Sequence, residues 1–190
     1  MRKLGVIFLA IIFIFMLAGC AEMLISDEFR EIREQEQTSI EEIWNIEDKN
    51  DFVYEMSDYI VEKCDYGSNL NALSEAERVL YITQTLEMEV NNGGFWQFFF
   101  NTPENVFRET AAALEAIGAE KTSSLYCEAA AAFGEEMPSS RTSRMRMLGK
   151  FGMEEGYEIL APYDDAFYSS GEDLNALNYA FIQNNRDAFS

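Results

Sequence analysis

Histidine is absent from this 190-residue sequence, and its absence removes several classes of catalytic site. A chain without histidine cannot build a Ser-His-Asp or Cys-His arrangement, a zinc site with imidazole ligands, or the general base that enzymes use most often. Two carboxylates at a suitable separation can still hydrolyse a glycoside. Because no spacing singles out such a pair among the 34 acidic residues, we expect a protein that is not an enzyme and uses no cofactor, with a carboxylate-based hydrolase of the cell envelope as an alternative.

Basic residues are scarce, since 14 lysine and arginine residues stand against 34 acidic ones, a formal net charge of −20. Such a charge repels nucleic acid and anionic lipid and attracts basic surfaces. We therefore expect no direct binding of nucleic acid and a basic protein as the partner. Aromatic and aliphatic residues occur along the whole chain, which distinguishes it from a disordered acidic tail.

Long hydrophobic runs are also few, and the clearest one lies near the start of the sequence. Arg2 and Lys3 precede an almost wholly apolar stretch at residues 4–17, which is shorter than the ~20 residues that a membrane-spanning helix needs. Small residues and a cysteine follow this stretch, which is the layout of an export signal. The end of the stretch, Leu17-Ala18-Gly19-Cys20, resembles the lipobox of bacterial lipoproteins, in which the cysteine receives lipid and becomes the new N-terminus.

This resemblance implies a cleaved signal peptide at residues 1–19, a lipidated Cys20 with a polar tether up to residue 38, and an acidic domain at residues 40–190. The acyl chains, palmitate among them, anchor such a protein to the cell membrane, facing outside the cytoplasm. Disulfides persist in that compartment, so Cys64 and Cys127 form a possible pair. The alternative is that each of them is a small apolar core residue.

The spacing of apolar residues predicts helices throughout the domain. Apolar residues recur at intervals of three and four from Ile40 to Cys64, which fits two helices divided near residues 48–50. Ser74 and Glu77 have the spacing of a capping box at the next helix start. Further helices are expected from Thr102-Pro103 to Gly118, over about 120–133, from Ser139 or Ser140 onward, and from near Ser170.

No stretch shows the alternation of apolar and polar residues that is typical of strands. We therefore expect the all-α class, with a single orthogonal bundle of about six to eight helices. The sequence is compatible with a monomer or a homodimer.

Two glycines lie inside a run of amide and aromatic residues at positions 91–101. In one interpretation the glycines make a tight turn, the aromatic rings fill the core and the amides bond to backbone groups that the turn leaves free. In the other, rings and amides line a pocket or a partner groove. The motif consists of Asn91, Asn92, Gly93, Gly94, Phe95, Gln97, Phe98, Phe99 and Asn101.

This motif, preceded by Glu87-Met88-Glu89-Val90 and followed by a helix ending in Ala116-Ile117-Gly118-Ala119, resembles the bacterial DNA-mimic protein 19 family. Residues 164–168, 172–174 and 179 also fit the closing pattern of that family, so the resemblance covers about residues 50–189. It implies an all-helical domain. The best-known member displays acidic side chains like duplex phosphates and occupies the DNA-binding face of basic proteins, which makes DNA mimicry an alternative function for this chain.

Acidic residues are densest between positions 27 and 62, and the acidic face expected to bind a basic partner lies there. It comprises Glu41, Glu42, Glu47, Asp48, Asp51, Glu55 and Asp58. A short basic run follows much later, and it either pairs with the surplus acid or contacts anionic headgroups. This run consists of Arg141, Arg144, Arg146 and Lys150.

Two pairs of neighbouring acids, Asp164-Asp165 and Glu172-Asp173, offer oxygen ligands to a cation. Their spacing does not fit a calcium loop, so no metal site is expected. Taken together, these features predict a membrane-anchored lipoprotein whose acidic helical domain binds a basic protein in the cell envelope.

Overall fold

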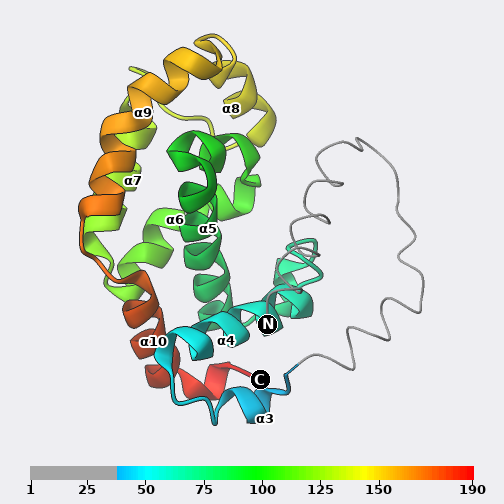
Figure 1. Cartoon of the computed structure of the whole chain (residues 1–190). Coiled ribbons are helices and arrows are strands. Elements are labelled where there is room, and N and C mark those ends of the chain that lie inside the picture. Colours follow the sequence, from blue (N-terminus) through cyan, green and yellow to red (C-terminus); the bar gives the residue numbers. More distant parts are fainter. Residues whose placement is uncertain (1–37) are drawn as a thin grey trace, which may run out of the picture. The chain divides into compact units, whose positions relative to one another are not determined.

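The structure is a computed structural model that describes residues 38–190, so the expected signal peptide, Cys20 and nearly all of the tether lie outside the described residues. Residues Thr38–Ser190 form one compact unit of eight α-helices and two short 3-10 helices (Figure 1). Residues 38–190 contain no strand. The expectation of an all-α domain with six to eight helices is confirmed.

The order of the elements is simple, because each helix follows the last through a short connection. The α-helices are α3 (Ile40–Ile43), α4 (Lys49–Lys63), α5 (Glu75–Asn101), α6 (Glu104–Ile117), α7 (Glu120–Ala131), α8 (Arg141–Leu148), α9 (Gly152–Ser169) and α10 (Leu174–Asn184); the 3-10 helices are η1 (Leu70–Ala72) and η2 (Arg186–Ala188). Within this described part, no helix has the combination of length and apolar character that a membrane span requires.

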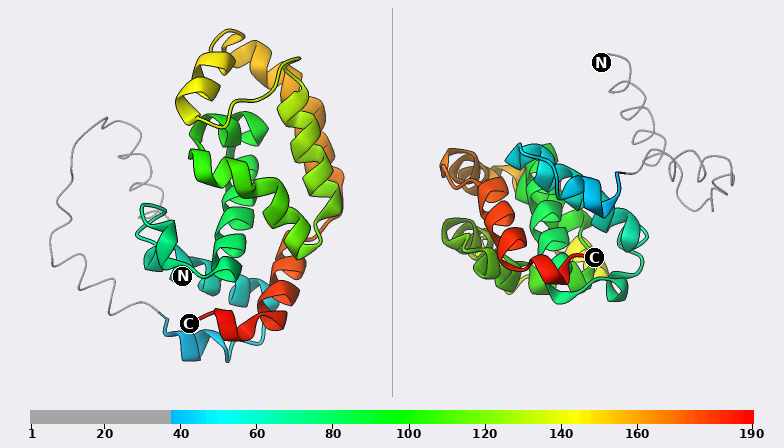
Figure 2. Two further views of the ribbon diagram at one scale, coloured as in Figure 1. Left: turned by 180° about the vertical axis from the view of Figure 1, so that it is seen from behind. Right: turned by 90° about the horizontal axis from the view of Figure 1, so that it is seen from below.

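Helix α5 lies at the centre of the unit, with other helices around it (Figure 2), and contacts α4, α6, α8, α9 and α10. Apolar residues of α5 belong to three clusters, the smallest of which lies around Ile82. The upper cluster joins α5 from Leu86 onward to residues of α6 to α10 and includes Phe95, Phe99, Leu114 and Leu160. The lower cluster joins the start of α5 to α3, α4, α10 and η2. Because residues from both ends of the described part meet there, the lower cluster brings α4 against α10.

Side chains near the expected positions start several of these helices. Asp48 accepts hydrogen bonds from the N–H groups of Asn50 and Asp51 and so caps α4, which places the division between α3 and α4 where the sequence predicts it. Ser74 and Glu77 form the expected capping box at the start of α5. Such caps satisfy backbone donors that the first turn of a helix leaves without an intrahelical partner.

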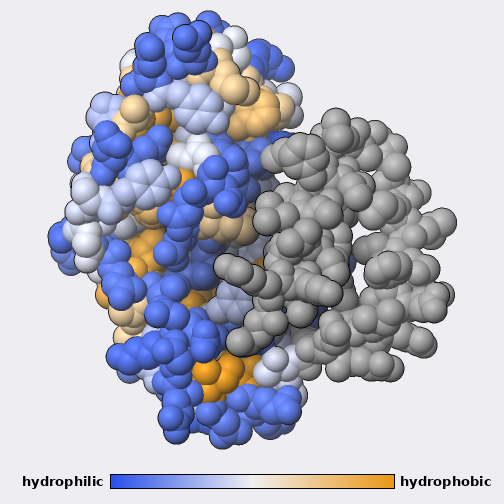
Figure 3. All heavy atoms as spheres, viewed as in Figure 1, coloured by the Kyte–Doolittle hydropathy of each residue, from blue (hydrophilic) through white to orange (hydrophobic). Residues whose placement is uncertain are grey.

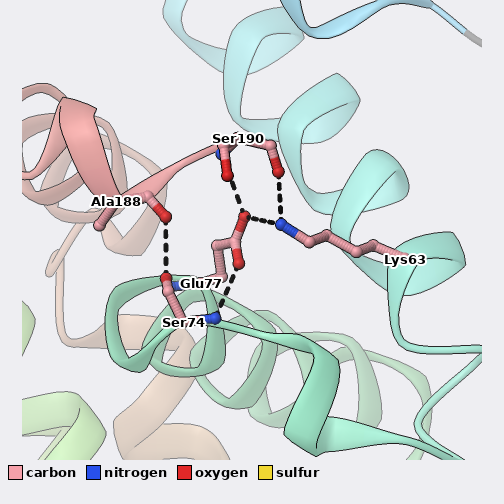
Figure 4. A network of polar contacts seen from close by, with 5 residues as sticks. All are labelled: Lys63, Ser74, Glu77, Ala188 and Ser190. Carbon is pink, nitrogen blue, oxygen red and sulfur yellow. Dashed lines mark hydrogen bonds and ion pairs between the residues drawn. The ribbon is translucent and has the colours of Figure 1, made fainter.

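Glu77 also connects three distant segments, as Figure 4 shows. Its buried carboxylate contacts the Lys63 ammonium at 2.8 Å, at the end of α4, and accepts a hydrogen bond from the Ser190 N–H at 3.3 Å. Ser74 donates to the Ala188 carbonyl at 2.9 Å, and Lys63 donates to the Ser190 carbonyl. The start of α5, the end of α4 and the segment after η2 are therefore held together by one buried acid.

Three details of the helix prediction are corrected. Pro103, not Thr102, is the N-cap of α6, because the Thr102 hydroxyl bonds to the Phe98 carbonyl at the end of α5. The helix expected from Ser139 or Ser140 has Ser140 as its N-cap, as predicted, but it is short and ends at Leu148. Helix α9, which follows it, was not expected at all.

The two cysteines in this part of the chain are both free. Cys64 is buried at the end of α4, whereas Cys127 is exposed on α7. The possible disulfide between them is therefore absent from this structure, and only Cys64 fits the alternative of a small core residue.

Candidate functional site

The glycine motif lies at a break within α5 and not at the end of the helix. Gly93 and Gly94 depart from helical geometry, with Gly94 at φ +69°, and the chain then resumes the helix. Phe95 is the first residue of this second half. Its N–H donates a hydrogen bond to the Asp164 carboxylate of α9 at 2.8 Å. A Cβ atom at Gly94 would lie 2.4 Å from the same carboxylate, so glycine is needed both for its φ angle and for this close approach.

The motif's aromatic side chains fill the core. Phe95, Phe98 and Phe99 are completely buried, and Phe99 packs edge to face against Phe98 and Phe107. Trp96 lies so close to α9 that a Cβ atom at Gly156 would overlap its ring. These residues hold α5 against its neighbours and present little surface to a ligand.

Two amide side chains of the motif form hydrogen bonds that connect the two halves of α5. Gln97 and Asn101, in the second half of α5, both donate to the Glu89 carboxylate in the first half, each at 2.9 Å. Asn91 and Asn92 are exposed beside the break. The arrangement agrees with a turn that is closed by its own side chains, the first of the two interpretations of this motif.

The acidic residues expected to bind a partner lie on α3, α4 and the connection between them. All are exposed except Glu55, which is half-buried and accepts a hydrogen bond from Thr38. Two of the exposed ones cap helices, since Glu42 completes the capping box of α3 and Asp48 caps α4. The face is therefore acidic and exposed, and part of its charge also stabilises helix starts. The remaining members are Glu41, Glu47, Asp51 and Asp58.

The outward side of α9 forms a second acidic face, which the sequence did not reveal because no helix was expected there. We call it the α9 face and define it by Glu154, Tyr157, Glu158, Asp165 and Tyr168, all exposed. These positions fall on one side of a helix with 3.6 residues per turn. No lysine or arginine occurs in α9.

The basic run does not form a continuous surface. Arg144 is completely buried and donates to the backbone carbonyls of Phe99, Thr102, Pro138 and Ser139. Its guanidinium also stacks 4.2 Å from the centre of the Phe107 ring. The other three are exposed: Arg141 bonds to the Phe100 carbonyl, Lys150 pairs with Glu135, and Arg146 lies between them on α8.

The basic residues of the domain are mostly engaged in contacts with the domain itself. Residues 38–190 contain ten lysine and arginine residues against 28 acidic ones. Nine of the ten contact a carboxylate, a backbone carbonyl or an aromatic ring: Lys49, Lys63, Arg78, Arg108, Lys121, Arg141, Arg144, Lys150 and Arg186. Because the acids outnumber the bases by 28 to ten, the surface presents a negative field to a partner.

Three of the four acids considered as cation ligands cap helices, and the fourth, Asp165, is exposed. Glu172 accepts hydrogen bonds from the N–H groups of Lys121 and Thr122 and from the Thr122 hydroxyl, and so caps α7 from outside. Asp173 caps α10, and Asp164 caps the second half of α5. Among residues 38–190, no three acidic or cysteine side chains gather in a way that could hold a metal ion.

Two carboxyl groups have a raised pKa. Burial is the main cause for both; the charge of Asp173 adds to it at Glu87, and the charge of Asp165 adds to it at Asp164. Neither lines the concave surface between α6 and α7, which has a volume of about 490 Å³ and is formed mainly by apolar side chains. Its lining includes Phe107, Tyr126, Cys127, Ala130 and Met137.

Comparison with known proteins gives one match. A family model described as DMP19-like protein matches residues 71–185, which extend from η1 to the end of α10. No curated protein and no solved structure matches the chain. The matched region contains the glycine motif and α9, whereas the acidic residues of α3 and α4 precede it.

Proposed function

Because this chain belongs to the DMP19-like protein family, we propose that its helical domain is a non-enzymatic module that binds a basic protein through its acidic surface. The observation that carries the proposal is the balance of charge: residues 38–190 carry 28 acidic residues against ten basic ones, and acidic helix faces are exposed. Such a surface attracts a basic partner over a distance of several ångströms and increases the rate of association.

The proposal includes the place where the module acts. The export signal and the lipobox ending in Cys20 support a lipoprotein that is anchored to the cell membrane outside the cytoplasm, where it binds a partner of the cell envelope. Replacement of Cys20 by alanine tests the anchor. The variant should lose both the incorporation of labelled palmitate and the sedimentation with membranes; unchanged labelling would contradict the lipid anchor.

Affinity capture with the full-length chain tests the binding function. Immobilised protein is exposed separately to envelope and cytoplasmic extracts, and bound proteins are eluted with rising salt. We expect a basic envelope protein that elutes at moderate salt, because screening shortens the reach of surface charges to about 8 Å at physiological ionic strength. The absence of any salt-sensitive partner would contradict the function.

Two matched variants show which acidic face binds that partner. The variant E41Q/E47Q/D51N removes three exposed charges from the region of α3 and α4, and E154Q/E158Q/D165N removes three from the α9 face. Both change the net charge by the same amount and by the same chemistry. A difference in affinity between them therefore reports position, not total charge.

DNA mimicry is the second candidate function, and the family match together with the exposed acids of α9 favours it. Four exposed acids of α9, which are Glu154, Glu155, Glu158 and Asp165, extend over ~16 Å of helix, a length over which a single DNA strand carries several phosphates. A mimic should displace duplex DNA from a basic DNA-binding protein in a fluorescence anisotropy assay, and the E154Q/E158Q/D165N variant should do so less well.

A further inference from the structure

The α9 face combines negative charge with exposed aromatic rings. Its acids, Glu154, Glu158 and Asp165, have no cationic partner within residues 38–190. Tyr157 and Tyr168 lie beside them, 37% and 56% exposed, and Met153 at the start of α9 is 66% exposed. In Figure 3, hydrophilic residues cover most of the visible face of the domain and hydrophobic ones form small patches between them. The α9 face thus offers two different kinds of contact at the same place.

Both tyrosine rings are held in fixed positions although they are exposed. The Tyr168 hydroxyl donates to the Val90 carbonyl at 2.6 Å, and its ring packs edge to face against Phe167. The Tyr157 ring packs against Trp96, with 5.7 Å between the ring centres. A ring that is already fixed loses little conformational entropy when a partner stacks on it, so these rings are suited to recognition.

Pro162 adds a hydrogen-bond acceptor to the same side of α9. Proline has no N–H and cannot donate to the carbonyl four residues earlier, which belongs to Glu158. Glu158 and Pro162 are both exposed. At Glu158, therefore, a carboxylate and a backbone carbonyl without its usual helical donor lie close together, next to Tyr157.

We propose that the α9 face binds an arginine-rich segment of the partner and prefers arginine to lysine. The guanidinium group has five donors in a plane, so it can bond to a carboxylate and a carbonyl while it stacks on an aromatic ring. An ammonium group is a compact point charge without this geometry. The negative charge of α9 selects a basic segment, and the fixed rings together with the carbonyl select arginine among basic residues.

The chain itself shows how arginine behaves beside such groups. Arg144 bonds to backbone carbonyls while it lies 4.2 Å from the centre of the Phe107 ring, and Arg186 lies 4.3 Å from the centre of the Trp44 ring. Lys49, by comparison, approaches the Tyr179 ring only to 5.3 Å. Stacking combined with carbonyl contact is therefore already used inside this domain.

The experiment compares two short synthetic peptides, one of alternating arginine and serine and one of alternating lysine and serine. Their affinities for the full-length chain, purified in detergent, are measured by fluorescence anisotropy at low and at physiological salt. We expect the arginine peptide to bind about fivefold more tightly, the effect of stacking at exposed rings. The variant E154Q/E158Q/D165N should bind both peptides weakly, and the matched variant E41Q/E47Q/D51N should keep the preference.

A second pair of variants isolates the rings. Y157L/Y168L should bind the two peptides with similar affinity, whereas Y157F, which keeps a ring against Trp96 and leaves the Tyr168 hydroxyl bond in place, should retain the preference for arginine. Circular dichroism should confirm that both variants remain helical. The inference rests on the proposed function, but different outcomes of the experiment would contradict each of them. Equal, salt-sensitive binding of both peptides, or loss of binding only in E41Q/E47Q/D51N, would overturn the α9 assignment alone. The absence of salt-sensitive binding to either peptide would overturn the proposed function as well.

Discussion

The Asp164 carboxylate accepts a hydrogen bond from the Phe95 N–H at 2.8 Å, so a side chain of α9 caps a helix half that belongs to α5. The break at Gly93 and Gly94 exposes backbone donors in the middle of a 27-residue helix. An acid from another helix satisfies one of them, and a substitution on either side of this contact affects both helices.

Gly94→Ala should destabilise the domain by about 3 kcal/mol, because a positive φ angle and a close contact with Asp164 both oppose a Cβ atom. Gly118→Ala is the comparison, since Gly118 has a left-handed helical conformation (φ +80°, ψ +21°) and nothing lies within 4 Å of its would-be Cβ, whereas Gly94 at ψ −176° lies in a region that essentially only glycine occupies. Gly118→Ala should cost only about 1 kcal/mol. Urea unfolding measures both, and equal losses would show that neither the backbone conformation of Gly94 nor its contact with Asp164 adds to the cost.

Asp164→Ala should cost about 1 kcal/mol, the value of a lost helix cap, whereas Asp164→Asn should cost less because its amide oxygen still accepts from Phe95. The pH dependence gives a second readout. Burial raises the pKa of Asp164 above its usual 3.8, so the folded state disfavours the charged form. Its contribution to stability is complete below pH 3.8 and is lost as the pH rises through the raised pKa. Relative to the wild type, Asp164→Asn should therefore gain stability as the pH rises above 3.8; a constant difference would refute the shift.

Glu172→Ala should destabilise the domain by about 1–2 kcal/mol, because its carboxylate supplies the side-chain cap that α7 lacks in its own sequence. Thermal unfolding followed by circular dichroism measures the change. Glu155→Ala, an exposed acid on α9, serves as the control and should change the stability by less than ~0.5 kcal/mol.

Arg144→Lys should destabilise the domain by about 3 kcal/mol or more, since one ammonium group cannot reach the four carbonyls that the buried guanidinium satisfies. Arg146→Lys on the same helix should be nearly neutral, because Arg146 is exposed. Chemical denaturation measures the free energy of unfolding of both variants. An unchanged stability in Arg144→Lys would show that the carbonyls find other donors.

Local signals in the sequence predict much of this fold. Ser74 with Glu77 marks the start of α5, and Gly118 ends α6 in the left-handed conformation. The α9 helix escaped prediction because Gly156 and Pro162, both typical helix breakers, lie within it. The need for glycine at position 156 comes from the Trp96 ring, which leaves no room for a Cβ atom there. The two residues are 60 positions apart in the sequence.

The same limit applies to the candidate site. A count of charges along the sequence finds the acidic residues around α4, because they are close together in the chain. The α9 face depends on which side of an unexpected helix is exposed. The glycines indicate a turn at positions 93 and 94, but nothing near them shows that Asp164, 69 residues after Phe95, caps the helix half that follows. Tertiary contacts of this kind leave no local pattern to read.

The lower apolar cluster bears on the order in which the chain folds. Ile43, Phe52 and Ile60 of α3 and α4 share that cluster with Ile182 and Phe189, which are synthesised more than a hundred residues later. Contacts between segments so far apart form slowly, since closing a long loop precedes any gain from burial. The first helices therefore complete their core only after residues 182–189 have been synthesised and have left the ribosome.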